Sequence, residues 1–361
     1  MRVTLIRPGE LGPSEVSAWR AMQRATPALN NPFLAPDYAI AVGSVRPQSR
    51  VAVLLDGGHV SGFFPFERRG MGIGVPISGW LSSCQGVIYE EENEWDAADL
   101  MSACGLAAWK FDNLLPDQKP FVPYHNATRP APAIDLSGGF DCYYAGLRAR
   151  ASQFCRELER KARKMEREVG PLTVDSGSRD PKALATLIAW KSQQYQRTAH
   201  VDRFEQPWLA SLLERLLAMQ AAEFAGVLSV MYAGGQPVAA QFGLRSDRVL
   251  VGWFTGYDAR YAKYSPGLIH LLRMARNLNA DVDAIHMGKG ARAYTQHLKN
   301  QEILVSDGMV TTRSALGLAH RAVSTASKHA LEASRQSPRV HDALDGILRG
   351  LGVSKRAYGR L

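Results

Sequence analysis

Residues 249–300 read VLVGWFTGYDARYAKYSPGLIHLLRMARNLNADVDAIHMGKGARAYTQHLKN, and this stretch decides the fold. Its first part, Val249–Gly256, is an apolar and aromatic run typical of a strand, and the polar loop Tyr257–Ser265 follows it. Apolar residues then recur at helical spacing, and Ala284–Met287 has the pattern of a short buried strand. The stretch therefore predicts a strand–loop–helix–strand unit.

The helix of this unit is predicted to begin at Pro266–Gly267. Ser265 can cap it, and proline fits the first helical turn, where no backbone N–H is needed. The loop and the helix start bring backbone N–H groups and the positive end of the helix dipole to one point. We expect an anion-binding site there, and pyrophosphate is the commonest biological anion held in this way.

The composition is that of a globular protein with room for two domains. The chain has 361 residues, of which 21% are charged and 46% are hydrophobic. The longest uncharged run, Gly70–Tyr89, is too rich in Gly, Ser and Pro for a membrane span, and we expect no secretory signal. The four cysteines lie far apart, without a CxxC pair or a histidine cluster. We therefore expect a cytoplasmic protein that binds no metal.

Positive charge is concentrated in residues 313–361. The whole chain carries a formal charge of +9, and this tail has nine Lys or Arg against three acids, a balance of +6. It could attract an acidic partner or an anionic membrane surface, which would make the protein peripheral to the inner membrane, or it could be a solvated tail. A helical pattern over Ala315–Ala333 precedes Arg335 and Arg339, whose R-x-x-x-R spacing suits the phosphates of a cyclic dinucleotide.

The longest helical pattern, Tyr143–Glu168, mixes basic and acidic residues. Mixed signs at helical spacing are typical of a solvated, salt-bridged face, and the interspersed acids argue against the alternative of a nucleic-acid-binding helix. The pattern ends at Gly170–Pro171, where we place a domain boundary. The predicted organisation is one domain over residues 1–170, a second over residues 171–312, and a basic helical tail.

Both halves show the same order of helices and strands, with a hairpin after two helices. In the first half the predicted strands are Met1–Leu5, Val51–Leu55, Val60–Phe66, Ile77–Leu81, Val87–Tyr89, Trp109–Leu115 and Ala133–Leu136, and the predicted helices are Ser14–Thr26 (capped by Ser14), Asp37–Val45 and Glu94–Ala108. In the second half the unit at residues 249–300 is flanked by the strands Leu172–Val174, Val227–Tyr232, Val238–Leu244, Ile303–Val305 and Met309–Thr312 and by the helices Asp180–Thr198, Pro207–Phe224 and Ala291–Leu298. Glycine pairs at 57–58 and 234–235 mark the two hairpin turns.

Three segments carry a family resemblance: Gly235–Ala240 (GQPVAA), Tyr264–Gly267 (YSPG), and the GKG…Y pattern from Gly288 to Tyr294. With the element order, they resemble the GNAT superfamily of N-acyltransferases, and the duplication resembles its Fem-type branch. The chain resembles most closely the CelD-like acetyltransferases of bacterial exopolysaccharide biosynthesis, over about residues 1–312. The resemblance implies an α/β (α+β) fold of two tandem GNAT-like domains, each a mixed, mostly antiparallel sheet flanked by helices.

The resemblance also implies an acyl-CoA donor, with acetyl-CoA the simplest case, and no metal. In GNAT-like folds the fourth and fifth strands part and leave backbone groups free for the donor; here these strand ends are Gly252–Thr255 and His286–Gly288. The helix start Tyr264–Gly267 would hold the pyrophosphate, with Lys263 or Arg260 as a charge partner.

Acyl transfer to an amine needs a group that accepts the amine proton and one that protonates the leaving thiolate. By the resemblance, Tyr294 is the predicted acid, with a packing role as the alternative. Asp258 is a candidate base or a turn carboxylate. His286 and His297 are further candidates, each with a hydrogen-bonded core histidine as the alternative.

The predicted acceptor is an amino sugar or a lipid- or nucleotide-linked precursor of an exported polysaccharide. The residues predicted to face it are Lys191, Gln194, Tyr195, Gln241, Trp253, Phe254, Tyr257 and Lys289. Lys191 could instead lie at the surface, and the aromatic residues could belong to the core rather than stack on a sugar ring.

Other enzyme classes lack their motifs, because the chain has no G-x-S-x-G, no G-x-x-x-x-G-K-[ST] and no H-E-x-x-H. Two other functions stay open. One is a Fem-type transferase that uses aminoacyl-tRNA, which the basic helix favours and the lack of a long helical arm in the second half disfavours. The other is a regulated binding module whose basic tail senses a cyclic dinucleotide.

Overall fold

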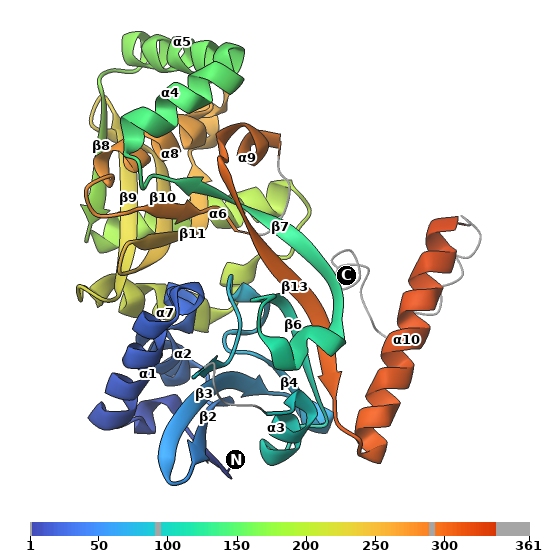
Figure 1. The fold of residues 1–361 in the computed structure, drawn as a ribbon. Helices are drawn as coiled ribbons and strands as arrows, with labels where there is room; N and C mark the ends of the chain where they lie inside the picture. Colours follow the sequence, from blue (N-terminus) through green and yellow to red (C-terminus); the bar gives the residue numbers. More distant parts are fainter. Residues whose placement is uncertain (1, 91–94, 289–292, 337–361) are drawn as a thin grey trace.

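The computed structural model describes residues 2–90, 95–288 and 293–336 (Figure 1). The first half contains the strands β1 (Arg2–Ile6), β2 (Ser49–Asp56), β3 (His59–Arg68), β4 (Ile73–Pro76), β5 (Ile88–Tyr89), β6 (Ala108–Leu114) and β7 (His125–Asp135) and the helices α1 (Pro13–Ala25), α2 (Pro36–Val45) and α3 (Ala97–Ala103). Two helices, α4 (Phe140–Arg150) and α5 (Ser152–Glu168), connect it to the second half.

The second half repeats this order of elements. Its strands are β8 (Leu172–Ser178), β9 (Ala225–Ala233), β10 (Gln236–Ser246), β11 (Val249–Tyr257), β12 (Ala284–His286) and β13 (Gln301–Thr311), and its helices are α6 (Pro181–Arg197), α7 (Pro207–Ala218), α8 (Pro266–Asn277), α9 (Ala293–Leu298) and α10 (Ala315–Gln336). The predicted α/β architecture with two similar halves is therefore confirmed.

Both predicted hairpins form, and their glycine pairs explain why. Gly57 and Gly58 join β2 to β3 with φ of 54° and 90°, and Gly234 and Gly235 join β9 to β10 with φ of 54° and 79°. Two successive residues with positive φ make the turn whose twist matches that of paired strands, and glycine adopts this conformation without a steric penalty.

The two halves build one continuous mixed sheet in the order β1-β2-β3-β4-β6-β13-β7-β12-β11-β10-β9-β8, with β5 paired to β3 off this path. The order shows an exchange of strands. β7, from the first half, pairs with β12 of the second half, and β13, from the second half, pairs with β6 of the first. β7 and β13 also pair with each other along most of their length and cross the middle of the molecule together (Figure 1). Each half thus completes its sheet with a strand from the other half.

One hydrophobic core is shared by both halves. It packs Trp19 of α1 and Phe63 of β3 together with Leu213 of α7 and Phe242 of β10, all of them fully buried. On the opposite face of the second half, α4, α5 and α8 cover the strands, and α3 covers the corresponding face of the first half. Because the shared core spans both halves, we expect them to unfold together.

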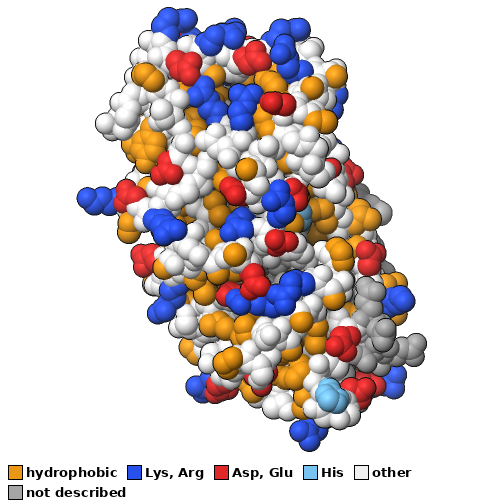
Figure 2. All heavy atoms as spheres, turned by 60° about the vertical axis from the view of Figure 1, so that its left-hand side comes forward, with side chains coloured by type: hydrophobic (Ala, Val, Ile, Leu, Met, Phe, Trp, Pro, Cys, Tyr) orange, Lys and Arg blue, Asp and Glu red, His pale blue; other side chains and the backbone are white. Residues whose placement is uncertain are grey.

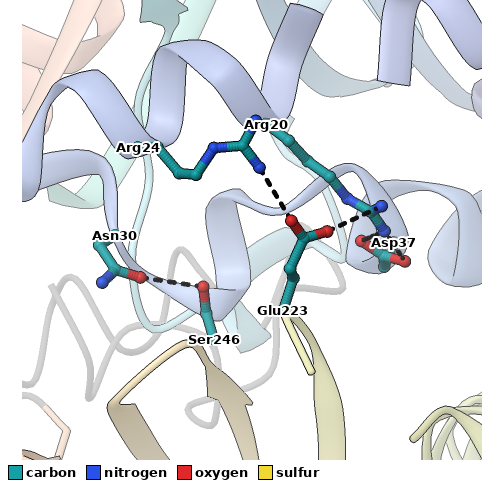
Figure 3. A network of polar contacts seen from close by, with 6 residues as sticks. All are labelled: Arg20, Arg24, Asn30, Asp37, Glu223 and Ser246. Carbon is teal, nitrogen blue, oxygen red and sulfur yellow. Dashed lines mark hydrogen bonds and ion pairs between the residues drawn. The ribbon is translucent and has the colours of Figure 1, made fainter. Parts of the chain in front are cut away.

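Polar contacts join the halves at the rim of this core (Figure 3). Glu223 forms ion pairs with the guanidinium groups of Arg20 and Arg24 in α1, with N–O distances of 2.9 Å and 2.8 Å. The guanidinium of Arg46 lies 4.5 Å from the ring centre of Trp208 in α7 and also pairs with the fully buried Glu67 at 2.8 Å. A buried carboxylate needs such a partner, so Arg46 connects the two halves and stabilises the first.

Several predicted element boundaries are wrong, each for a local backbone reason. The helix predicted over Tyr143–Glu168 is two helices, because Ala151 has φ −140° and ψ 48°. This break lets Tyr143 of α4 donate a hydrogen bond to the Leu298 carbonyl while α5 crosses to α8. The strand predicted over Ile77–Leu81 does not form, because Ser78 and Gly79 both have φ of 62°.

Other corrections concern caps and lengths. The cap position of α1 is Gly12, not Ser14, and the helix starts with Pro13. The helix predicted over Glu94–Ala108 is confined to Ala97–Ala103 by Asp96 at its start and by Gly105, with φ 65°, at its end. α7 ends at Ala218 instead of Phe224. The two strands predicted at Ile303–Val305 and Met309–Thr312 are the single strand β13, which contains a bulge near Gly308.

The basic tail begins as the predicted helix α10, which stands beside the body of the protein (Figure 1). Arg335 lies near its end and Arg339 lies outside the described residues, so the cyclic dinucleotide site stays a prediction. Within residues 2–90, 95–288 and 293–336, no helix has the length and apolar character needed to cross a bilayer.

Candidate active site

The strands β11 and β12 run parallel for three residue pairs and then part. Their pairing ends at Val251 opposite His286, whereas β11 continues to Tyr257 beside β10. The cause is a bulge in β11: Phe242 pairs with Phe254 and Gly243 with Gly252, so Trp253 is an extra residue on one strand. A bulge bends its strand and increases the local twist, which turns β11 away from β12.

The gap between the strands is lined by small and polar groups. Gly252 has no side chain, and a Cβ there would lie 3.0 Å from Gln241 Nε2 and 3.6 Å from the His286 carbonyl oxygen. Gln241 is buried and accepts a hydrogen bond from Thr255 Oγ1 at 3.3 Å. A substrate arm lying in the gap would therefore meet strand backbone and an amide side chain rather than apolar side chains.

The first turn of α8 lies against this gap. A Cβ on Gly267 would be 4.0 Å from Thr255 Cγ2 and 3.8 Å from Tyr257 Cδ1, so the helix start touches the far half of β11. The cap position is Ser265, as expected, but the predicted side-chain cap is wrong. Ser265 has φ 56°, and its hydroxyl instead accepts a hydrogen bond from Lys161 at 3.0 Å. The positive end of the helix and a lysine ammonium thus meet beside the gap, an arrangement suited to an anion.

Helix α5 holds the loop before α8 in place. Glu168 accepts a hydrogen bond from the Tyr264 hydroxyl at 2.6 Å and lies 3.5 Å from Lys263 Nζ. Lys263, a predicted phosphate partner, is therefore partly neutralised by Glu168. Lys161, which lies 3.8 Å from a carboxylate oxygen of Glu157, is a site residue that sequence reasoning misses. Its only signal is a place in the basic run of Tyr143–Glu168, whose mixed charges predict a solvated face.

Asp258 caps the short 3-10 helix Ala259–Tyr264 and forms a two-point ion pair with Arg260, with a shortest N–O distance of 2.5 Å. Hydrogen bonds from the Arg260 side chain hold the pKa of Asp258 below its usual value. A carboxylate with a lowered pKa accepts a proton poorly, so these contacts favour the turn role over the base role. Arg260 is likewise engaged by this carboxylate.

His286 ends β12 at the edge of the gap. Burial lowers its pKa to about 4, so the ring is neutral at pH 7 and a weak base. Tyr294 lies in the first turn of α9, the helix that follows β12. Lys289 lies outside the described residues. The ring of His297 stacks on Phe154, with 4.8 Å between the ring centres.

The predicted acceptor residues do not share one face of the sheet. Lys191 and Tyr195 are on α6, where Lys191 Nζ lies 5.2 Å from the centre of the Tyr195 ring and donates a hydrogen bond to Gln194. α6 packs on the face that carries Phe242, whereas Gln241 points to the α8 face. Sequence reasoning groups Gln241 with Lys191 and Tyr195 because it does not follow the alternation of side chains along β10.

The three aromatic candidates on β11 also separate. Trp253 is half-buried against the first half, where its ring lies 5.2 Å from that of Phe33 and its N–H donates to the Leu81 carbonyl at 2.9 Å. Phe254 is part of the shared core. Tyr257 lies beside Gly267 at the α8 start. Stacking on a sugar stays a prediction for all three, and only Tyr257 is next to the gap.

The first half contains the equivalent parallel pair, β4 and β6, but its gap is filled. The pairing ends at Gly74 opposite Trp109, and the segment around Gln85 then lies along β6. The Gln85 backbone N–H donates a hydrogen bond to the Asn113 carbonyl, and its carbonyl accepts one from the Leu115 N–H. Its side-chain oxygen accepts hydrogen bonds from two further N–H groups of β6. A donor has no free strand edge to occupy there.

The helix after β4 is also unsuited to phosphate. α3 is capped by the Asp96 carboxylate and carries Asp99 in its first turn. Two carboxylates at a helix start occupy the N–H groups and repel an anion. Within the described residues, the second half therefore combines an open gap with a helix start that carries a cation, and the first half does not.

The pKa of His270, on α8, allows the burial of this helix to be tested through the pH dependence of stability. It is fully buried, it bonds to Ser229 at 2.8 Å, and burial lowers its pKa to about 3 from the ordinary 6.5. As the pH falls, this imidazole gains a proton near pH 6.5 in the unfolded chain but only near pH 3 in the folded protein. The contribution of His270 to the unfolding free energy is therefore complete above pH 6.5 and is lost as the pH falls toward 3. We expect the unfolding free energy to fall by about 2 kcal/mol more between pH 6.5 and pH 5 in the wild type than in His270→Met.

Urea unfolding at the two pH values measures this difference. His59→Gln, at the exposed tip of the first hairpin, is the matched control and should keep the wild-type pH slope. An identical slope in His270→Met would show that this imidazole does not stay neutral in the folded protein.

Comparisons with known proteins agree with this geometry. Residues 152–296 match the acetyltransferase (GNAT) domain family, while no curated protein sequence matches the chain. Among solved structures, FemX is similar with a TM-score of 0.59 at 9% identity, over 86% of this chain and 96% of that one. The C-terminal domain of a putative lysylphosphatidylglycerol synthetase from Agrobacterium fabrum has a TM-score of 0.53 at 10% identity, over 86% and 96%. A tandem GNAT protein from the clavulanic acid biosynthesis pathway has a TM-score of 0.50 at 9% identity, over 87% and 99%.

The family match gives residues 152–296 the class of an acyltransferase domain. The chain carries a GNAT-type acetyltransferase domain in its second half, within a fold shared with Fem-type and tandem GNAT proteins, and it is an enzyme. The structural similarities, at about a tenth sequence identity, show the fold alone.

Proposed function

We propose that the enzyme is an acyl-CoA-dependent N-acyltransferase, with acetyl-CoA as the simplest donor. The observation that supports this is the bulge at Trp253, which parts β11 from β12 directly beside the start of α8. A thioester arm fits between parted strands because their backbone groups can bind its amides. Phosphates fit the helix start because it presents N–H groups and a positive dipole.

The proposed donor site consists of residues on both sides of this point. The helix start from Tyr264 to Gly267 would hold the pyrophosphate, with Lys161 and Lys263 as charge partners. Gly252 would admit the thioester arm between the strands. No metal is needed for these contacts, because the helix start and the lysines supply the positive charge.

In the proposed reaction the amine nitrogen of the acceptor attacks the thioester carbonyl, the C–S bond breaks, and an amide and a thiol form. The attacking amine loses a proton and the leaving thiolate gains one, so one group must accept a proton and another must supply one. Tyr294 is proposed to protonate the thiolate. Asp258 and His286 stay candidates for the base, although the lowered pKa of each disfavours that role.

The proposed acceptor is an amino sugar, free or as a lipid- or nucleotide-linked precursor of an exopolysaccharide. This rests on the resemblance of Gly235–Ala240 and Tyr264–Gly267 to CelD-like acetyltransferases. Lys191 and Tyr195 on the α6 face are proposed to meet the acceptor, while the donor lies on the α8 face, so the two substrates would approach the gap from opposite sides of the sheet.

Titration calorimetry with acetyl-CoA tests the donor site. We expect one molecule of acetyl-CoA per chain, because Gln85 fills the equivalent gap and carboxylates cap α3 in the described part of the first half. Two sites per chain would contradict the filled gap. No binding at all would contradict the proposed donor.

A Fem-type aminoacyl transferase is the second candidate, and the charge on α4 and α5 favours it. Lys and Arg side chains gather at this end of the molecule (Figure 2). Many of them pair with acids of the same helix, as Arg160 does with Glu157 at 2.7 Å, which leaves less charge for a nucleic acid. Salt-dependent binding of tRNA on a filter, together with no heat from acetyl-CoA, would favour this candidate.

A further inference from the structure

Gln241, on β10, is a buried amide that uses only one of its two ends. Its side chain is 5% exposed, and its Oε1 accepts a hydrogen bond from Thr255 Oγ1 at 3.3 Å. Its Nε2 donates to no acceptor among residues 2–90, 95–288 and 293–336. A buried amide nitrogen normally has a hydrogen-bond acceptor, so this group calls for an explanation.

The free end of this amide is the end that faces the gap between β11 and β12. Gln241 and Thr255 are direct partners in the pairing of β10 with β11, so their side chains lie on the same face of the sheet. With Oε1 turned to Thr255, Nε2 lies over Gly252, where an added Cβ would be 3.0 Å away. The gap is therefore supplied with a hydrogen-bond donor.

This donor lies at the closed end of the gap. The pairing of β11 with β12 ends at Val251, so Gly252 is the first residue of β11 beyond the point where the strands part. The start of α8 lies at the open end, where Gly267 approaches Thr255. Strand residues rise by about 3.3 Å each, so Gly252 and Thr255 are separated by up to about 10 Å. An arm with its phosphates at the α8 start would therefore bring its far end, the thioester, toward Gly252 and Gln241.

We propose that Gln241 is a catalytic residue, whose Nε2–H group donates a hydrogen bond to the thioester carbonyl oxygen of the acyl donor. This inference rests on the proposed acyl-CoA donor. It moves Gln241 from the acceptor residues, where the sequence groups it, to the donor side of the site. Its neighbour Thr255 is a positioning residue, because its hydroxyl holds the oxygen end of the amide away from the gap.

The amide would act on the charge that develops during transfer. When the amine nitrogen attacks the carbonyl carbon, one electron pair of the C=O bond moves onto the oxygen, and Nε2–H donates to this oxyanion. The pair returns as the C–S bond breaks, and the sulfur leaves with the electrons of that bond. The amine proton goes to the base and the thiolate takes a proton from the acid, so Gln241 loses no proton. A donor that is already in place stabilises an oxyanion without reorganisation of the site.

Infrared spectroscopy of bound acetyl-CoA, labelled with carbon-13 at the thioester carbonyl, tests this contact without an acceptor. A hydrogen bond to the oxygen weakens the C=O bond, so the carbonyl stretch should move to higher frequency in Gln241→Met. Calorimetry should show that this variant binds acetyl-CoA only about 2- to 10-fold more weakly, as expected for the loss of one hydrogen bond. Thr255→Val keeps the amide but not the contact that orients it, and should give an intermediate frequency.

Gln23→Met is the matched control. Gln23 is a buried glutamine of the first half, 8% exposed, whose Nε2 donates to the Leu29 carbonyl at 3.0 Å. This variant should keep the wild-type frequency and affinity. Thermal unfolding shows which variants are folded, and Thr255→Val, which preserves the shape of the side chain, decides the matter if Gln241→Met does not fold.

The outcomes separate this inference from the proposed function. A wild-type protein that binds acetyl-CoA with the same carbonyl frequency as Gln241→Met or Thr255→Val would overturn the role of Gln241 alone. A loss of affinity of about 100-fold in Gln241→Met with an unchanged frequency would also overturn it, because the amide would then hold another part of the donor. Absence of acetyl-CoA binding in the wild type would overturn the proposed donor and this role together.

Discussion

Gly252→Val is expected to abolish binding of acetyl-CoA and the transfer reaction while the protein stays folded. The new side chain would grow from β11 into the gap, toward Gln241 Nε2 at 3.0 Å and the His286 carbonyl oxygen at 3.6 Å. Gln241 is the end of a flexible side chain and can move, so the cost to the fold is about 1–3 kcal/mol. In the proposed site the donor arm passes Gly252, so we expect its affinity to fall by about 100-fold or more, or about 2.7 kcal/mol.

A graded series makes this result interpretable. Gly252→Ala adds one methyl group and should weaken donor binding by about tenfold. Gly146→Ala, in α4 with its nearest contact at 3.6 Å, is the control for an added methyl group elsewhere and should bind like the wild type. Calorimetry measures donor affinity, and thermal unfolding shows that each variant is folded. Wild-type affinity in Gly252→Val would show that the donor does not pass between β11 and β12.

Much of the backbone order of both halves is readable from the sequence because these elements have local causes. The glycine pairs Gly57–Gly58 and Gly234–Gly235 fix the hairpins, and Pro266 fixes the start of α8. The presence of a short strand after α8, β12, follows from the apolar pattern of Ala284–Met287. These features depend on residues that are close together in the chain, so a single sequence is enough to predict them.

The features that make the site depend on residues far apart in the chain. The bulge at Trp253 depends on the pairing register between β10 and β11, and the sequence of either strand alone does not indicate that register. Lys161 reaches Ser265 only because α5 crosses α8 after the break at Ala151. The filled gap in the first half depends on Gln85 folding onto β6. Local pattern contains no signal for such contacts, so a single sequence predicts the types of the site residues and not their arrangement.

Residues 171–312 alone, the predicted second domain, are expected not to fold into a monomer. The fragment lacks β7, which covers the edge of β12, and it retains β13, whose partners β6 and β7 are both in the first half. It also exposes the α7 side of the shared core, including Leu213 and Phe242. A circular dichroism melt of the purified fragment should show no cooperative transition, and the fragment should not bind acetyl-CoA.

The cause of this failure can be separated from a general loss of stability by supplying the missing strand in trans. Residues 1–170 expressed with residues 171–312 contain every strand of the sheet, so the two fragments should purify together and recover both the melt and donor binding. A fragment of residues 125–312 tests how much β7 alone restores, since it covers the β12 edge but leaves the shared core exposed. If residues 171–312 fold by themselves and bind acetyl-CoA, the exchange of β7 and β13 is not needed for either half. If they fold only with their partner, the proposed donor site between β11 and β12 depends on a strand from the first half.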